Sequence, residues 1–382
     1  MKIVDRVTER FRDMVGEDPR GVWSAPGHVT VVGEHTDYNG GLALTVAIDR
    51  HAVVAVGIRD DGLVRVVPPH RSDSVTVELS RCVPGSVSGW AAYPLGVLWA
   101  LGSARGGMPG LDIVIDTDVT SGTTMASTSE IQCAVAIAVN DLWDLDLGRL
   151  ELAYAVQRAE SDMVGVSMGI VNQMATLFGG EDRSVFIDCQ LPEASAVPFA
   201  LESEGLALFV IHANGRATRN SNDHQRQRTI CDDAARAMGV DQLRDLAVDD
   251  LPKLRASVND ETFRYARHVV TENARVAAVA DLLRHDGVNA IGDFLVASHL
   301  SMKNDANISE PQFDLAVDVA RENGALGARL TDDGMGSAVI ALAPRDRMPS
   351  IHRAVRQALS TGGYGEPEFS VVTPTREANR VY

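Results

Sequence analysis

The segment from Ala25 to Gly41 constrains the fold more than any other part of this chain. An apolar run over 28–33 leads into a turn that lies between glycines, and a second apolar run over 42–48 follows. This pattern predicts two strands joined by a polar turn. The turn carries Glu34, His35, Asp37 and Tyr38. Carboxylates accept strong charge-assisted hydrogen bonds from hydroxyl groups, so the turn is typical of a site for a polyhydroxylated ligand. An acidic surface turn is the alternative.

Strand and helix patterns are mixed along the rest of the chain and predict an α/β (α+β) fold. Strands are expected at 28–33, 42–48, 51–58, 63–68, 111–115, 185–189, 207–211 and 339–343. Helices are expected at 2–16, 90–101, 131–143, 149–164, from about 169, within 225–300, at 311–323 and at 349–360. The pattern restarts near 196, so we expect an N-terminal domain of residues 1–195 and a C-terminal domain of residues 196–382.

The composition argues against several classes of partner. A net charge of −17, with no block of Lys and Arg, argues against nucleic acid and against an anionic membrane. No run of 18 apolar residues could span a bilayer, and the N-terminus lacks the apolar stretch of a signal peptide. The widely spaced Cys82, Cys133, Cys189 and Cys231 are expected to be buried thiols of a reducing compartment. We therefore expect a cytoplasmic protein, and the sequence does not indicate its oligomeric state.

The segment at 25–41 resembles the sugar-binding signature of galactokinases, within the superfamily that also holds homoserine and mevalonate kinases. The resemblance runs over nearly the whole chain and implies a GHMP-kinase-like fold of two domains. The N-terminal domain would be like the second domain of a small-subunit ribosomal protein, and the C-terminal domain would be ferredoxin-like, with the ligand cleft between them. The resemblance assigns sugar binding to Glu34, His35, Asp37 and Tyr38, and it places His224 where galactokinases have a sugar-contacting Tyr.

The loop at 120–130 is the candidate phosphate cradle. A loop of small residues that leads into a helix can bind anions through backbone amides and the positive helix end. The resemblance assigns this role to Gly122, Thr124 and Ser127, although Thr124 replaces a glycine and Glu130 replaces a small residue. Glu130 adds a negative charge at this place. The alternative is a Ser/Thr-rich loop that caps a helix and binds no ligand.

The segment at 158–173 resembles the part of the family that carries a magnesium-binding Glu and, twelve residues later, the catalytic Asp. Glu160 matches the metal ligand, and Thr128 could complete the cation site. Asn172 stands in the Asp position and cannot act as a general base, because its amide does not titrate in this range. The Arg that flanks the Asp in the family is His28 here. Homoserine kinases manage without the Asp, so Asn172 alone does not exclude a kinase.

The segment at 327–337 corresponds to a glycine-rich turn of the family, and Asp332 and Asp333 replace two of its glycines. Each like-charge contact with a phosphate costs about 1 kcal/mol or more even in high dielectric, so the two acids oppose nucleotide binding. The alternative is a solvent turn between a helix and a strand, because Asp-Asp-Gly suits any turn.

Taken together, the sugar-binding residues are retained and the phosphate-handling segments are altered. This contrast predicts a divergent enzyme that binds a sugar or sugar-bearing metabolite and catalyses a non-phosphorylating isomerisation, elimination or rearrangement, with no cofactor favoured. Its candidate catalytic residues are His28, Asn172, Asp332, Asp333 and Glu130, and His224 is a further acid/base candidate. One alternative is a functional ATP-dependent galactokinase or related sugar kinase that uses ATP and magnesium. The other is a non-catalytic sugar sensor.

Overall fold

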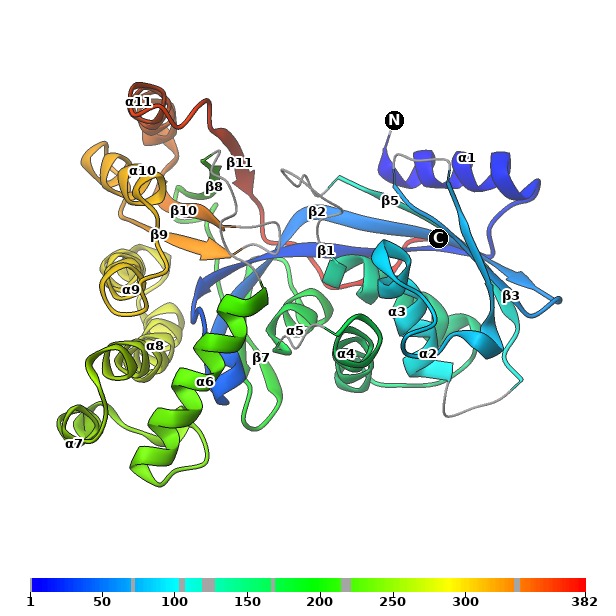
Figure 1. Cartoon of the computed structure of the whole chain (residues 1–382). Coiled ribbons are helices and arrows are strands. Elements are labelled where there is room, and N and C mark those ends of the chain that lie inside the picture. The colour runs from blue at the N-terminus through cyan, green and yellow to red at the C-terminus, as the bar shows by residue number, and fades with distance from the viewer. Residues whose placement is uncertain are drawn as a thin grey trace. The chain divides into compact units, whose positions relative to one another are not determined.

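The structure is a computed structural model that describes residues 2–69, 73–102, 107–118, 128–165, 169–213, 221–332 and 337–382 (Figure 1). For residues 128, 221–224, 332 and 337 it describes the backbone alone. The chain forms two compact units. Unit 1 comprises Met1–His28, Ala47–Gly179 and Thr375–Tyr382, and unit 2 comprises Val29–Val46 and Gly180–Pro374. Strands β1 (Gly21–Val32) and β2 (Leu42–Arg59) contribute residues to both.

Unit 1 is built on a mixed sheet. Strand β2 pairs antiparallel with β5 (Gly110–Thr117), and β5 pairs parallel with β3 (Leu63–Val67). Strand β3 pairs antiparallel with β4 (Val75–Glu78), and β1 pairs antiparallel with β12 (Asn379–Arg380). Buried valines, isoleucines and alanines dominate β2 and β5, as expected for strands covered on both faces.

Helices cover both faces of this sheet. On one face lies α1 (Ile3–Val15), whose buried Val7 and Phe11 belong to a core cluster with Val53 and Val114. Gly57 makes room for this packing, since a Cβ at this position would lie 2.7 Å from Cζ of Phe11. On the other face lie α2 (Ala92–Gly102), α3 (Thr128–Leu142), α4 (Arg149–Arg158) and α5 (Val171–Phe178) (Figure 1). A single π-helical turn at Ala159–Val164 follows α4.

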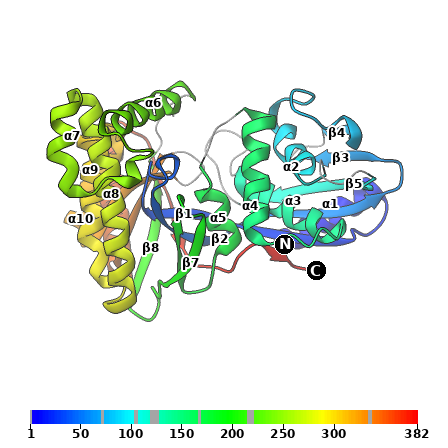
Figure 2. The same cartoon turned by 90° about the horizontal axis from the view of Figure 1, so that it is seen from below.

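Unit 2 contains an antiparallel sheet of β8 (Leu206–His212), β9 (Gly327–Asp332), β10 (Ser337–Pro344) and β11 (Glu368–Val372), in the order β11-β8-β10-β9. Its helices are α6 (Ser221–Met238), α7 (Leu251–Ser257), α8 (Asp260–His285), α9 (Gly292–Asn304), α10 (Pro311–Glu322) and α11 (Met348–Thr361). Figure 2 shows α6 to α10 from below. The first residues of β2 pair with β6 (Arg183–Asp188), which pairs with β7 (Glu193–Pro198).

Local sequence accounts for the long helix α8 of unit 2. The side chain of Asn259 caps its N-terminus by accepting a hydrogen bond from the backbone N–H of Thr262 at 2.9 Å. Acidic residues occupy the first turn and basic residues the last, which complements the helix dipole. The capped helix holds His268 and Glu272, one turn apart, inside unit 2.

The predicted mixture of strands and helices is confirmed, with four differences. The strand expected at 28–33 begins at Gly21, and the strands expected at 42–48 and 51–58 form one continuous strand. In the segment at 327–337, which was compared with a glycine-rich turn of the family, residues 327–332 form the strand β9 and pair with β10. Strands β4, β7, β11 and β12 were not predicted, because they are short and largely exposed and carry little apolar pattern. Among the described residues, no helix is long and apolar enough to cross a membrane.

Candidate functional site

The polar turn after β1 lies in unit 2 and is shaped by its glycines. Gly33 has a φ of 107°, and a Cβ there would lie 2.7 Å from the carbonyl oxygen of Leu42. Thr36 is fully buried and its hydroxyl reaches the carbonyl oxygens of Gly33 and Leu42, at 2.9 and 2.7 Å. The backbone amides of Asn39 and Gly41 both donate to the carbonyl oxygen of Thr36. The turn is therefore rigid, as a preorganised binding site requires.

The side chains of the polar turn differ in how far they are exposed. Glu34, His35, Asp37 and Tyr38 are each partly exposed. The intervening Thr36 and the following Asn39 are buried. The four side chains that the sequence predicted to bind sugar are thus the ones that this turn leaves accessible within unit 2.

His35 and Tyr38 are held by a second tyrosine. Nδ1 of His35 lies 3.1 Å from the hydroxyl oxygen of Tyr38, which lies 2.8 Å from the hydroxyl oxygen of Tyr265 on α8. His35 occupies the left-handed region with a φ of 61°, which a non-glycine residue adopts only when its surroundings enforce it. Burial raises the pKa of the Tyr38 phenol well above its ordinary value. Tyr38 therefore keeps its proton and acts as a neutral hydrogen-bonding group.

Glu34 is fixed by a buried arginine from β9. Nη2 of Arg329 lies 2.9 Å from Oε1 of Glu34, and the arginine side chain is fully buried. Arg329 also donates to the carbonyl oxygens of Val31 and Leu330, at 2.9 and 2.7 Å. The hydroxyl of Thr331 donates to the same Glu34 oxygen at 3.0 Å. Two residues of β9 thus set the direction of the Glu34 carboxylate.

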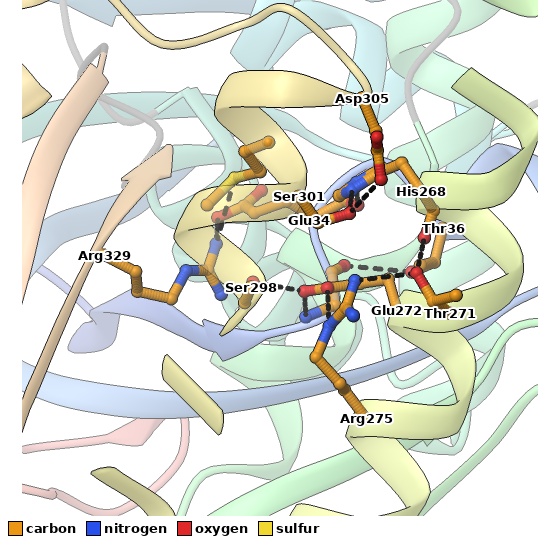
Figure 3. A network of polar contacts seen from close by, with 12 residues as sticks. Glu34, Thr36, His268, Thr271, Glu272, Arg275, Ser298, Ser301, Asp305 and Arg329 are labelled. Carbon is orange, nitrogen blue, oxygen red and sulfur yellow. Dashed lines mark hydrogen bonds and ion pairs between the residues drawn. The ribbon is translucent and has the colours of Figure 1, made fainter. Parts of the chain in front are cut away.

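A second buried carboxylate, Glu272 on α8, supports the turn (Figure 3). Its Oε1 accepts from the backbone N–H of Gly33 at 3.0 Å and from the hydroxyl of Ser298 at 2.6 Å, and its Oε2 accepts from Nε of Arg275 at 2.7 Å. Burial raises the pKa of Glu272, but the positive charges of Arg275 and Arg329 and the hydrogen bond from Ser298 outweigh it and hold the pKa at about 2. Glu272 is therefore an ionised anchor for the turn.

His268 ties the same helix to Glu34. Its Nε2 lies 3.1 Å from the carbonyl oxygen of Glu34, and its Nδ1 lies 3.0 Å from the hydroxyl oxygen of Ser301 on α9 (Figure 3). Burial lowers the pKa of His268, which favours a neutral ring that donates its Nε2 proton to the carbonyl.

Unit 1 brings together three predicted catalytic residues that lie far apart in the sequence. His28 is 2% exposed and Glu130 is 1% exposed. Nδ1 of His28 lies 3.1 Å from Oε1 of Glu130, in the first turn of α3, and Nε2 of His28 lies 3.1 Å from Oδ1 of Asn172, near the start of α5. Oε2 of Glu130 is buried and has no hydrogen-bond partner within the described ranges.

Glu160 lies beside this cluster, in the π-helical turn. Its Oε2 accepts from Nε2 of Gln173 at 2.9 Å. Burial raises the pKa of Glu160 to about 7, and the charge of Glu130 contributes to the rise. Single π-helical turns are frequent at functional sites, and this one directs a carboxylate into the interior of unit 1.

Several predicted residues fall outside the described residues. Gly122, Thr124, Ser127 and Asp333 belong to these, as do the side chains of Thr128, His224 and Asp332. The described backbone shows that α3 starts at Thr128, directly after the predicted phosphate loop. It also shows that Asp332 ends β9, opposite Ser337 of β10. The roles assigned to all these residues stay predictions.

The sequence analysis missed the residues that hold the polar turn. Arg329, His268 and Glu272 are fully buried, and Tyr265 is 4% exposed. A signal was present, because His268, Glu272 and Arg275 repeat at helical spacing among apolar neighbours. Ionisable residues on the apolar face of a helix are rarely buried without partners. Their partners, however, lie more than 200 positions away in the sequence, at Gly33 and Glu34.

Three family profiles match the chain. One described as galactokinase galactose-binding signature matches residues 9–58, one described as GHMP kinases N terminal domain matches residues 92–180, and one described as GHMP kinases C terminal matches residues 279–361. The chain therefore has the GHMP-kinase-like two-domain fold, as the sequence predicted.

Similar proteins cover the whole chain. The galactokinase of Streptomyces coelicolor is 37% identical over 382 residues, which is 99% of each chain. The galactokinase of Mycobacterium tuberculosis is 37% identical over 91% of this chain and 96% of its own. The crystal structure of Lactococcus lactis galactokinase complexed with galactose has a TM-score of 0.92 at 24% identity and covers 100% of both chains.

These comparisons overturn one expectation. The preference for a non-kinase enzyme with isomerisation, elimination or rearrangement chemistry is wrong, because the relatives that match end to end are named galactokinases. The inference of a divergent active site rested on single residues in loops, and it gave too little weight to similarity along the whole chain.

Proposed function

Because the chain belongs to the galactokinase family, we propose that it is an ATP-dependent sugar kinase that transfers the γ-phosphoryl group of ATP to galactose. The observation that carries the proposal is the polar turn, in which Glu34, His35, Asp37 and Tyr38 are accessible while their neighbours are buried and hydrogen-bonded. A fixed set of hydrogen-bonding groups is what recognition of a polyhydroxylated substrate requires. The cytoplasmic location expected from the sequence stays a prediction.

The sugar contacts follow from this turn. We assign Glu34 and Asp37 to separate hydroxyl groups, because two carboxylates three positions apart in a rigid turn can each accept one hydroxyl proton. His35 and Tyr38 add a ring nitrogen and a phenol that Tyr265 holds in place. We place His28 and Asn172 beside the reacting carbon, and His224 among the sugar contacts, as the family resemblance implies.

Replacing Asp37 with Ala is expected to weaken galactose binding about tenfold to hundredfold, since a hydrogen bond to a charged group contributes about 1.5–3 kcal/mol. Isothermal titration with galactose measures the effect. Asp233→Ala is the matched control, because it removes an exposed carboxylate that pairs with Arg236 on the surface of α6. An unchanged affinity in Asp37→Ala would remove Asp37 from the sugar site.

A magnesium ion fits the oxygen donors around Glu160. Magnesium in kinases is held by one or two carboxylates together with phosphate oxygens. Oε1 of Gln173 is buried without a hydrogen-bond partner among the described residues, next to the Glu160 carboxylate that accepts from its Nε2. Among the described residues, no group of three or more Asp, Glu, His or Cys is placed so that it could hold a metal ion by itself, but a site completed by phosphate and water does not need one. We assign Glu160 and Thr128 to the metal, which when bound neutralises charge on the phosphates.

The nucleotide phosphates are assigned to the loop that precedes α3. Gly122, Thr124 and Ser127 would supply backbone and hydroxyl groups, and α3 starts directly after them. In the reaction, the sugar oxygen forms a bond to the γ-phosphorus, the bond from that phosphorus to the bridging oxygen breaks with ADP leaving, and the hydroxyl proton passes to solvent. Positioning and electrostatics supply most of the rate in phosphoryl transfer, so Asn172 is compatible with this chemistry.

The purified chain is expected to release ADP in the presence of galactose, ATP and magnesium, at about 1 s⁻¹ or faster, the low end of ordinary enzyme rates. A coupled ADP assay measures this, with galactose omitted as the blank and glucose as the epimeric control. The variant Glu160→Gln is expected to lose most of this ADP release at a low magnesium concentration, because it removes a carboxylate assigned to the metal. Sugar binding without galactose-dependent ADP release would contradict the proposed function.

A further inference from the structure

Strand β9 divides its side chains between two environments. Ala328 and Leu330 belong to the buried hydrophobic core cluster of unit 2. Arg329 and Thr331 alternate with them along the strand and contact the polar turn instead. The hydroxyl of Thr331 also lies 3.2 Å from the carbonyl oxygen of Thr30, at the end of β1. Thr331 is 1% exposed, so any effect of its hydroxyl on a ligand has to pass through another residue.

That residue is Glu34, whose carboxylate is held at one oxygen by two donors. Nη2 of Arg329 lies 2.9 Å from Oε1 of Glu34, and the hydroxyl oxygen of Thr331 lies 3.0 Å from the same atom. A single donor would let the carboxylate swing about the contact, whereas two donors from different backbone positions prevent this motion. Arg329 cannot follow a moving carboxylate, because it also donates to the carbonyl oxygens of Val31 and Leu330. Oε1 of Glu34 therefore has a fixed position.

The backbone of the polar turn has supports of its own, which do not involve Thr331. The backbone N–H of Gly33 donates to Oε1 of Glu272 at 3.0 Å, and the carbonyl oxygen of Glu34 lies 3.1 Å from Nε2 of His268 (Figure 3). Both supports come from α8 rather than from β9. Loss of the Thr331 hydroxyl is therefore expected to loosen the carboxylate of Glu34 and to leave the turn in place.

We propose that Thr331 is a positioning residue for sugar specificity: by holding the Glu34 carboxylate, its hydroxyl determines how strongly the site requires the one sugar hydroxyl that Glu34 accepts. This inference rests on the proposed function, in which Glu34 and Asp37 accept separate hydroxyl groups of galactose. A carboxylate that is fixed before binding loses little freedom when the sugar arrives. A site built to pair with a hydroxyl discriminates against a sugar that lacks it. Thr331 contributes to both effects without contacting the sugar.

The decisive variant is Thr331→Val, which removes the hydroxyl and keeps the size and branching of the side chain. Isothermal titration compares galactose with its monodeoxy analogues, each of which lacks one hydroxyl group. Glu34→Asp identifies the hydroxyl that Glu34 accepts, because it draws the carboxylate back by one methylene and keeps the charge that faces Arg329. We expect Thr331→Val to weaken galactose binding about threefold to tenfold, the effect of one hydrogen bond. Its affinity for the analogue that lacks the identified hydroxyl should stay unchanged.

Further variants at the same position make the result specific. Thr331→Ser keeps the hydroxyl and should keep the discrimination between the two sugars within about twofold, whereas Thr331→Ala lacks the hydroxyl and should reproduce the pattern of Thr331→Val. The matched control is Thr8→Val, because Thr8 is a buried threonine on α1 whose hydroxyl donates to the carbonyl oxygen of Val4 at 2.8 Å. This control should leave the affinities for both sugars unchanged. The analogue that lacks the hydroxyl assigned to Asp37 should lose affinity in Thr331→Val by the same factor as galactose.

The coupled ADP assay adds a kinetic measure of the same role. In Thr331→Val, KM for galactose should rise by the factor measured in the titration and kcat should stay within about twofold, as when an interaction made equally before and during the reaction is removed. Neither KM nor a dissociation constant depends on the fraction of folded protein, so partial unfolding of a variant does not imitate this result.

The outcomes separate this inference from the proposed function. Equal losses of affinity for galactose and for every analogue would indicate general damage to the site and would overturn the inference, as would unchanged galactose binding in Thr331→Val. An unmodified chain that binds galactose without galactose-dependent ADP release would contradict the proposed function, and the titrations would still decide the role of Thr331. An unmodified chain that does not bind galactose would contradict both.

Discussion

Replacing Arg329 with Met is expected to lower the free energy of unfolding by about 3–5 kcal/mol, the cost of breaking a buried ion pair by removing one partner. Arg329 is fully buried and donates to Glu34 and to two backbone carbonyls. Methionine fills much of the volume but provides no donor. The Glu34 carboxylate would lose its counter-ion, and the carbonyl of Val31 would lose a buried partner.

Urea denaturation measures this difference, and two further variants make it interpretable. Arg356→Met removes an arginine of an exposed pair with Glu366, and it should cost no more than about 1 kcal/mol. Arg329→Lys keeps the positive charge but cannot reproduce the planar set of donors, so its stability should lie between those of the unmodified chain and Arg329→Met. A loss below about 1 kcal/mol in Arg329→Met would mean that Arg329 does not anchor the polar turn.

The sequence predicted the polar turn well because its signal is local. Glycines with positive φ, a buried Thr36 and four partly exposed ligand-type side chains all lie within ten residues. Strand β2 was predicted as two strands, because Asp49, Arg50 and His51 interrupt its apolar pattern. These three side chains are only partly buried, so the strand continues through them without burying a charge.

The residues that hold the polar turn in place could not be predicted, because their roles depend on contacts between elements that are distant in the sequence. Arg329 is one charged residue in a short strand, and only the pairing of β9 with β10 places it inside unit 2. His28 and Asn172 were selected from the sequence together, because they replace an Arg and the Asp that it flanks in the family pattern. The structure shows that the His28 ring contacts both Asn172 and Glu130, and the sequence did not connect Glu130 to this pair.

Acid is expected to remove the stabilisation that Glu272 supplies. The pKa of Glu272 is about 2 in the folded chain, against an ordinary value of 4.5. The folded state therefore binds the Glu272 proton more weakly than the unfolded state does, and the carboxylate stabilises the fold fully above pH 4.5. This contribution is lost as the pH falls from 4.5 toward 2 and amounts to about 3 kcal/mol over the whole interval.

The measurement is the free energy of unfolding in urea at pH 6, 5, 4 and 3 for the unmodified chain and for Glu272→Gln. At pH 6 the variant should be less stable by about 3 kcal/mol or more, because the neutral amide leaves Arg275 and Arg329 without the charge that faces them. The difference should shrink by roughly 2 kcal/mol between pH 6 and pH 3, since most of the titration of the unfolded carboxylate falls in this range. Protonation of His268 adds a loss of its own, because its lowered pKa costs stability as the pH falls below its ordinary value of 6.5. Glu261→Gln on the same helix removes an exposed pair with Arg226 and should show a small difference at every pH. A pH-independent difference for Glu272→Gln would mean that Glu272 acts through its packing and hydrogen bonds rather than through its charge.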